Sequence, residues 1–231
     1  MRYLSLALLW LLNALHSVIP NWGLTIIALA VIIRVGLLPI TLRGQRQQMQ
    51  TIADQDRLKP LLDEIQVTFR GDPERLHKET KKVYAENNVS MLAPLAGCLW
   101  VLLQIPIFVG LYFVINESFD LRGAQFLWIQ NLSQADALFS FDFRIPYFGS
   151  GLNVLPFLMA ISQMLASNVS PAPNSDPAAQ STQTKFLAGM AITFFVLLYN
   201  FPSGLMLYWL MSNLGQIVQQ IWWNSRNKTT A

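Results

Sequence analysis

The chain has 231 residues, of which 53% are hydrophobic and only 13% are charged. Soluble globular domains carry charge on roughly a quarter of their residues, so this composition excludes an ordinary soluble domain and favours a membrane protein. The formal net charge is +3, but most Lys and Arg lie between Arg43 and Lys82, and this stretch also holds seven acidic residues, which argues against nucleic acid as a partner. The single cysteine, Cys98, excludes an internal disulfide.

The first segment, residues 1–19, combines Met1-Arg2 with a leucine-rich run, as do both secretory signals and helices that lie on a membrane surface. On a helical wheel its polar residues fall in one narrow stripe, and no small-residue cleavage site follows. We therefore prefer an amphipathic interfacial helix on the outer side over a cleaved signal, with Pro20-Asn21 forming the corner into the next element.

Five apolar segments are candidates for membrane-spanning helices, because about twenty apolar residues are needed to cross roughly 30 Å of hydrocarbon. The five segments cover residues 20–42, 91–116, 151–168, 185–200 and 201–223. The third and fourth are short, which indicates either extension into polar flanks or locally thinner lipid. The predicted fold class is all-α, a polytopic membrane protein with five transmembrane helices.

The charges of the connecting segments predict the orientation of these helices. Residues 43–90 contain nine Lys or Arg, whereas the loop 117–150 contains only Arg122 and Arg144. By the positive-inside rule the first segment is cytoplasmic and the second is periplasmic, so the amino terminus lies outside. The loop 169–184 and the tail 224–231 are then cytoplasmic.

The cytoplasmic segment 43–90 has helical spacing on both sides of Arg70-Gly71-Asp72-Pro73, a turn signal that places Pro73 at the start of a second helix. This pattern predicts a helical hairpin with a thin apolar seam. The loop 169–184 is rich in Pro, Ser, Asn, Ala and Gln and lacks aromatic residues, which predicts a flexible connection.

One charged residue, Arg34, lies inside the first predicted span, nine residues and therefore about 13 Å of helix rise from Arg43 at its cytoplasmic end. A mid-span arginine costs about 2.5–3.5 kcal/mol on insertion scales, and no predicted span contains an acidic residue to pair with it. Arg34 therefore predicts a water-filled recess, open to the cytoplasm, that receives negative charge from another molecule. The alternative is that Arg34 snorkels to the headgroups as a topology anchor.

Other polar side chains in the predicted spans are candidates to line this recess. They are Gln104, Ser162, Gln163, Asn213 and Gln216, with the aromatic pair Tyr208 and Trp209 on the last span. Each amide is equally compatible with hydrogen bonding between helices, so only their convergence would favour a groove.

Short motifs in a fixed order along the chain together resemble the YidC family of membrane insertases, from about Leu4 to Trp222. The motifs are Asn21-Trp22-Gly23, Arg34 with Leu38-Pro39-Ile40-Thr41, Gln104-Ile105-Pro106-Ile107-Phe108, Phe201-Pro202-Ser203-Gly204-Leu205, Leu207-Tyr208-Trp209 and Ser212-Asn213-Leu214. The resemblance implies a five-helix core in the bacterial inner membrane, with a hydrophilic groove open to the cytoplasm and to lipid.

By the same resemblance, Arg34, Gln163 and Trp209 belong to the substrate site. The implied function is that of an insertase or chaperone, which receives the polar tail of a client and releases its apolar segment into the bilayer. The implied clients are newly made membrane proteins, especially those with short acidic tails. Further implied partners are the Sec translocon, the ribosome or the signal-recognition machinery, and neither a cofactor nor a metal is expected.

The sequence departs from many relatives by starting just before the core, without an additional amino-terminal span and a large periplasmic domain, which fits a short natural form or an engineered core. It also ends without a long basic tail, which puts ribosome docking through such a tail in doubt. The rival function is a small transporter or channel, whose polar path would open on both faces. Motifs of intramembrane enzymes are absent from the sequence, so we expect no catalysis.

Overall fold

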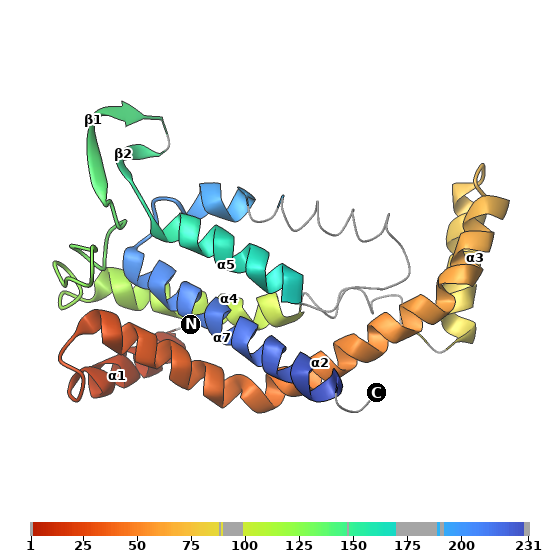
Figure 1. Cartoon of the computed structure of the whole chain (residues 1–231), viewed down its shortest axis with the longest axis horizontal. Coiled ribbons are helices and arrows are strands. Elements are labelled where there is room, and N and C mark those ends of the chain that lie inside the picture. The colour runs from red at the N-terminus through yellow and green to blue at the C-terminus, as the bar shows by residue number, and fades with distance from the viewer. Residues whose placement is uncertain are drawn as a thin grey trace. The chain divides into compact units, whose positions relative to one another are not determined.

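The computed structural model describes residues 2–87, 89, 99–146, 148–169, 189 and 192–228, and this part of the chain is mostly helical (Figure 1). The named elements are α1 (Arg2–His16), α2 (Trp22–Thr68), α3 (Pro73–Glu86), α4 (Leu99–Glu117), β1 (Phe139–Ile145), β2 (Gly149–Leu152), α5 (Leu155–Val169) and α7 (Ser203–Lys228). Residues 192–198 add a further short helical segment. The chain divides into two compact units, one formed by residues 1–37, 104–170 and 184–231 and the other by residues 38–103 and 171–183.

The helical bounds differ from the sequence-based ones at several points. Helix α2 runs without interruption past residue 42, where the prediction placed the boundary between span and hairpin. The loop 117–150 contains β1, which pairs antiparallel with β2, so the prediction of an all-α chain was wrong at this point. Helix α5 begins at Leu155 rather than at residue 151, because residues 149–152 form β2.

Some predicted segments fall outside the described residues. These are the start of the second span at residues 91–98, nearly all of the loop 169–184, and residues 185–188 and 190–191 of the fourth span. Among the described residues, one helical stretch, Trp22–Asp54, is both long and apolar enough to cross a membrane, and Gln104–Glu117 and Leu155–Val169 are shorter apolar helices.

The core of the first unit lies where α4, α7 and the first part of α2 pack together. Ile26, Leu111, Ile115 and Leu205 are fully buried there. Helix α7 approaches closely because Gly204 has no side chain: a Cβ at this position would lie 3.1 Å from both Ile26 Cδ1 and the carbonyl oxygen of Leu132. Small residues at helix contacts are typical of membrane bundles, where close packing replaces the hydrophobic effect as the driving force.

Helix α1 covers one side of this core. Its Leu8 and Leu12 are buried, and Leu8 Cδ1 would lie 3.0 Å from a Cβ on Gly110 of α4. The turn after α1 is held by a parallel stack of His16 on Trp22, with ring centroids 3.6 Å apart. The opposite face of α1 exposes Tyr3, Leu6 and Trp10, so the helix is apolar on both sides.

The first turn of α7 is held by the loop that follows α4. The backbone N–H of Ser203 donates to the carbonyl of Gln134 at 2.7 Å, and the N–H of Gly204 donates to that of Leu132 at 2.9 Å. The Ser203 hydroxyl donates to the carbonyl of Asn131 at 3.0 Å. Two of the four N–H groups that a helix start leaves open are thus satisfied by this loop, which covers this end of the bundle.

The start of α5 is capped by a carboxylate from the same loop. Asp136 is 3% exposed, and its Oδ2 accepts hydrogen bonds from the N–H groups of Val154 at 2.8 Å and Leu155 at 2.9 Å. The same oxygen accepts from Trp128 Nε1 at 3.1 Å. A negative charge at a helix start is favourable because the free N–H groups and the helix dipole both point toward it. Asp136 therefore connects the loop after α4 to α5.

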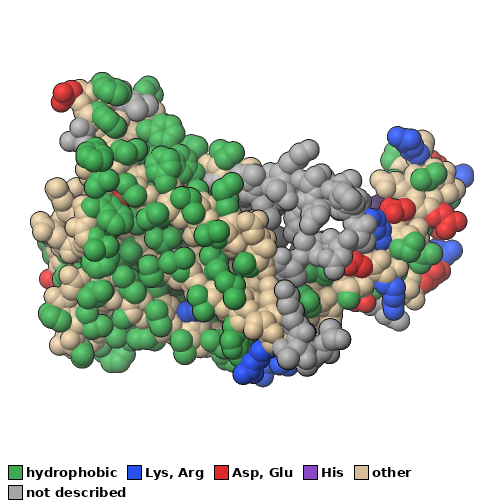
Figure 2. Space-filling model, viewed as in Figure 1, with side chains coloured by type: hydrophobic (Ala, Val, Ile, Leu, Met, Phe, Trp, Pro, Cys, Tyr) green, Lys and Arg blue, Asp and Glu red, His purple; other side chains and the backbone are tan. Residues whose placement is uncertain are grey.

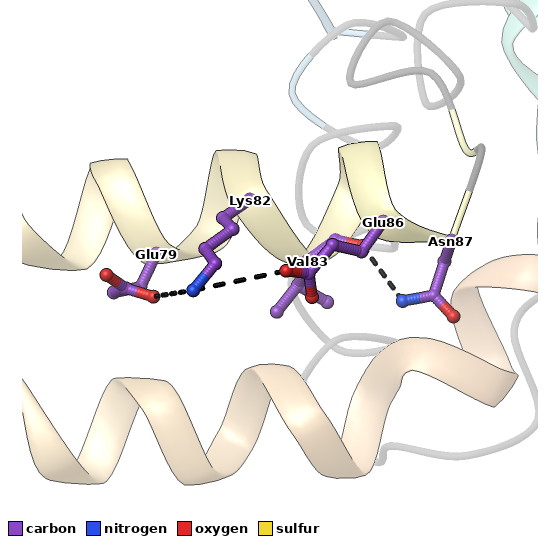
Figure 3. Close-up of polar contacts among 5 residues, drawn as sticks. All are labelled: Glu79, Lys82, Val83, Glu86 and Asn87. Atoms are coloured by element: carbon purple, nitrogen blue, oxygen red, sulfur yellow. Dashed lines mark hydrogen bonds and ion pairs between the residues drawn. The ribbon is translucent and has the colours of Figure 1, made fainter.

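The second unit contains α3, which is solvated and stabilised by local contacts. Asp72 caps its start by accepting from the N–H of Arg75 at 3.1 Å, and Pro73 occupies the first turn. Figure 3 shows Lys82 between Glu79, at 4.0 Å, and Glu86, at 3.9 Å. Such exposed ion pairs contribute little stability, so α3 presents a charged surface without a strong core of its own.

Gly23 in α2 gives a test of the packing. A Cβ on Gly23 would overlap the ring of Phe126, whereas a Cβ on Gly36 of the same helix would meet open space. We expect Gly23→Ala to lower the free energy of unfolding by about 1–3 kcal/mol through overpacking. The matched change Gly36→Ala should raise it by about 0.5–1 kcal/mol through helix propensity.

The measurement is the thermal unfolding midpoint of each variant in detergent. Equal midpoints for the two variants would contradict the close contact between Gly23 and Phe126.

Candidate functional site

The site is built around Arg34, whose side chain leaves α2 and lies against α7. Its neighbour there is Gly215, where a Cβ would lie 3.4 Å from Arg34 Cγ and 3.8 Å from Nε. The absence of a side chain at residue 215 therefore allows the arginine stem to lie flat on α7. The two residues are 181 positions apart in sequence and come together only through the packing of the helices.

The polar partner of Arg34 is an amide. Arg34 Nη2 donates to Gln219 Oε1 at 2.9 Å, and Gln219 is 8% exposed. The Arg34 Nε is buried without a hydrogen-bond partner among the described residues. Arg34 is not a member of the ion pairs Arg75–Asp72, Lys82–Glu79 and Lys82–Glu86 in the described residues. The guanidinium thus keeps its charge uncompensated by this part of the chain and has donor capacity to spare.

Tyr208 extends this polar cluster toward α4. Its side chain is almost fully buried, and Gln104 Nε2 of α4 donates to its hydroxyl at 3.2 Å. The side chain of Ser212 is hydrogen-bonded to the same hydroxyl, which lies within electrostatic range of Arg34. At 100° per residue, Tyr208, Ser212, Gly215 and Gln219 share one face of α7. We call Arg34, Gln104 and these four residues the arginine cluster.

A second polar cluster joins α5 to α7. Asn213 Nδ2 donates to Gln163 Oε1 at 3.1 Å and to Ser162 Oγ at 3.3 Å. The Ser162 hydroxyl itself donates to the carbonyl of Met159 at 2.8 Å. Asn213 lies more than a quarter turn around α7 from the face that carries Tyr208 and Gln219. We call Ser162, Gln163 and Asn213 the asparagine cluster.

The remaining two predicted site residues join neither cluster through a hydrogen bond. Trp209 packs edge-on between two rings, with centroids 5.0 Å from Phe108 and 5.3 Å from Phe194. Gln216 is exposed. The structure therefore brings Arg34, Gln104 and Tyr208 together and separately joins Ser162, Gln163 and Asn213.

Sequence reasoning missed three residues of the arginine cluster, namely Ser212, Gly215 and Gln219. The signal that could have found them is the spacing of polar and small residues at positions 208, 212, 215 and 219, which is the repeat of one helix face. Asn213, Gln216 and Gln220 obscure this pattern because they add polar residues on neighbouring faces.

The chemistry available at this site is binding. The arginine cluster offers a guanidinium, amides and hydroxyls, which can hold an anionic group through charge-assisted hydrogen bonds. In the described part of the chain, no group of three or more His, Cys, Asp or Glu side chains could hold a metal ion. A largely apolar helical fold with a partly buried guanidinium is typical of integral membrane proteins, in which such a charge marks a candidate binding site.

Comparison with known proteins identifies the family. Residues 14–230 match the family described as 60Kd inner membrane protein, and the chain belongs to this family. It is 39% identical over 219 residues to "Membrane protein insertase YidC" of Pasteurella multocida and 39% identical over 219 residues to the protein of the same name from Haemophilus influenzae strain PittEE. A third relative of that name, from Herminiimonas arsenicoxydans, is 33% identical over 217 residues.

These matches cover 94% of this chain but only 36% of each relative, so the chain spans about a third of the length of these relatives. The fold is similar to that of a solved structure described as "Active YidC insertase crystal structure with the first transmembrane domain resolved". The TM-score is 0.64 at 24% sequence identity, and the match covers 93% of this chain and 44% of that one. The family resemblance predicted from the sequence motifs is confirmed.

Asn213 gives a test of the asparagine cluster. Its amide joins two helices, so Asn213→Ala should lower the free energy of unfolding by about 0.6–2 kcal/mol, the range for hydrogen bonds between transmembrane helices. Gln216→Ala, at an exposed position on the same helix, should have little effect. Unfolding of both variants in mixed detergent micelles measures the difference, and an equal loss at the two positions would contradict a specific contribution from Asn213.

Proposed function

We propose that this chain is the core of a membrane protein insertase, which receives the polar tail of a client and releases its apolar segment into the bilayer. The observation that carries the proposal is Arg34, a charged group in an apolar helix bundle whose Nη2 donates to an amide and whose Nε has no hydrogen-bond partner among the described residues. The names of the relatives support the same function, although the match covers only 36% of those proteins.

The proposed topology has five spanning helices. They are residues 20–42, 91–116, 151–168, 185–200 and 201–223, with the amino terminus outside and the carboxyl terminus in the cytoplasm. Residues 1–19 lie on the outer surface, and residues 43–90 form the cytoplasmic hairpin. Two helix bounds support this arrangement, since α1 ends at His16 before a turn into α2 and α3 begins at Pro73.

The proposed mechanism uses Arg34 as the first binding group for a client. A wet recess around the arginine cluster shortens the dry path that a polar tail must cross, which lowers the cost of removing that tail from water. Coulomb attraction is stronger there than in bulk water, so an acidic tail is favoured over a neutral one. No bond is made or broken, and no cofactor takes part.

The packing at the loop-covered end of the bundle favours an insertase over the rival channel. Between that end and Arg34, the side chains of Ile26, Leu29 and Leu205 are fully buried and apolar. The first turn of α7 is also sealed by the loop 131–134 through backbone hydrogen bonds. A recess at Arg34 would then be closed at this end of the bundle, whereas a channel needs a polar path that opens on both faces of the membrane.

The asparagine cluster and Trp209 are proposed as a second wall of the recess. Gln163 supports this role because it is only half-buried and its amide nitrogen is not used in the bond to Asn213.

The clients are newly made membrane proteins. The exposed charges of α3 are a proposed contact for the ribosome or the signal-recognition machinery, and the Sec translocon is a further proposed partner.

The first functional prediction concerns Arg34. In liposomes, the chain should protect the translocated tail of a single-span client from added protease, and Arg34→Ala should slow this for an acidic tail more than for a neutral one. Hydrogen bonds to charged groups contribute about 1.5–3 kcal/mol, so we expect a loss of roughly tenfold in initial rate for the acidic client.

Arg43→Ala is the matched control, because it removes the same charge from an exposed position of the same helix. Arg34→Lys separates the charge itself from the geometry of the guanidinium. If both clients lose activity equally with Arg34→Ala, the electrostatic mechanism is wrong; if the unchanged chain protects no more tail than empty liposomes, the insertase assignment is wrong for this chain.

The second functional prediction concerns Gln219, the residue that holds Arg34. Gln219→Glu places a carboxylate at the oxygen that now accepts from Arg34 Nη2, and the resulting ion pair would occupy the guanidinium. Protection of acidic tails should fall while protection of neutral tails is retained. Gln216→Glu, the same change at an exposed position of α7, should leave both clients unaffected. A Gln219→Glu chain that still prefers acidic tails would exclude Arg34 as their binding group.

A further inference from the structure

The β1–β2 hairpin presents an aromatic face that the rest of the described chain leaves uncovered. Phe139, Phe141 and Phe143 alternate along β1 and are 61%, 39% and 62% exposed. The rings of Phe141 and Phe143 stack on each other, with centroids 5.4 Å apart, so they lie on the same side of the strand. Asp142 is exposed between these two stacked rings, and strand alternation places it on the other side, although the register with β2 is irregular between Ser140 and Ile145.

The partner strand contributes little to covering this face. Strand β2 consists of Gly149, Ser150, Gly151 and Leu152, and only Leu152, opposite Phe139, carries an apolar side chain. Gly149 has a φ of +79°, a backbone conformation that favours glycine, so this position of β2 carries no side chain. A lone two-stranded hairpin is marginally stable in water and needs a surface against its apolar face.

The position of the hairpin indicates which surface that is. Strand β2 ends at Leu152, and the apolar helix α5 begins three residues later. Helix α5 is two-faced: its inner residues are buried, and its outer face exposes the apolar side chains of Phe157, Ile161, Met164 and Leu165. In a protein of an inner-membrane family, an exposed apolar helix face of this kind is expected to contact lipid.

The aromatic face of the hairpin continues this lipid-facing surface. Figure 2 shows hydrophobic side chains over the hairpin and, without a charged band between them, over the bundle below it. Aromatic side chains are enriched where membrane proteins meet the headgroup region, because their rings tolerate both water and hydrocarbon. A soluble partner would have to cover Phe139 and Phe143 without covering the lipid-facing side chains of α5 beside them.

We propose that the β1–β2 hairpin is a membrane-surface anchor, with Phe139, Phe141 and Phe143 inserted into the interfacial region of the bilayer next to α5. Asp142 remains in water on the opposite side of the strand. Because Asp136 bonds the backbone at the start of α5, the anchor and this cap together set the depth at which α5 enters the membrane. This anchor is independent of the client site at Arg34.

The test uses single cysteines in the full chain, in which Cys98 is first changed to Ser. Phe141→Cys, Phe143→Cys and, as the neighbouring control on the other face, Asp142→Cys are each labelled with the environment-sensitive fluorophore NBD and reconstituted in phosphatidylcholine and phosphatidylglycerol liposomes. Two quenchers are compared, a nitroxide on the lipid acyl chain near the headgroup and iodide in the water. A circular dichroism spectrum of each variant checks that it is folded.

The anchor predicts a blue-shifted emission at residues 141 and 143, with quenching by the lipid nitroxide and protection from iodide. Residue 142 should show the reverse pattern. Quenching of all three labels by iodide alone would overturn the proposal and place the face in water. Protection of residues 141 and 143 from both quenchers, increasing with the number of chains per liposome, would also overturn it, since a second copy of the chain would then be the occupant.

Discussion

A charged side chain within an apolar helix bundle must be given polar partners by its neighbours, and this constraint organises the site of this protein. Arg34 leaves α2 at a point where the helix offers no other charged group. Helix α7 meets the need with one face, on which Gly215 lets the arginine stem pass and Gln219 accepts from the guanidinium. Tyr208 and Ser212 continue the same face, so one helix carries most of the polar environment of the arginine.

The polar face of α7 depends on rigid packing at the other end of the same helix. Gly204 brings α7 close to Ile26 of α2, and the backbone of Ser203 and Gly204 is bonded to the loop after α4. Since a helix is stiff, fixing its first turn sets the position of residues three to four turns later. The motif Phe201-Pro202-Ser203-Gly204 therefore acts on the site from a distance, through the position of α7.

The two polar clusters have different physical characters. In the arginine cluster a charge is retained with an amide as its partner, which leaves it able to attract an acidic group. In the asparagine cluster neutral side chains satisfy one another between α5 and α7, as expected for a contact that stabilises helix packing. The family to which the chain belongs consists of inner membrane proteins. In the proposed client site, the arginine cluster attracts the acidic tail, and the asparagine cluster forms part of the wall of the recess.

Much of this protein follows from its sequence alone. The low fraction of charged residues indicated the membrane class, because soluble domains carry charge on roughly a quarter of their residues. Arg34 was recognisable as unusual because it is a charged residue in an apolar run. The turn at Arg70-Gly71-Asp72-Pro73 was also readable, since Gly and Pro act locally on the backbone, and α3 begins at Pro73. The family was recognisable because its short motifs occur in a fixed order.

Other features were decided only by the tertiary structure. The pairing of Arg34 with Gln219 joins residues that no local rule connects, and the choice among Asn213, Gln216, Gln219 and Gln220 depends on how α7 is rotated against its neighbours. The β-hairpin was missed because its second strand consists largely of glycine and serine, which carry no strand signal of their own. The cap by Asp136 was missed because it joins a loop carboxylate to backbone groups 18 and 19 positions later, and no local sequence pattern indicates which N–H groups that carboxylate reaches.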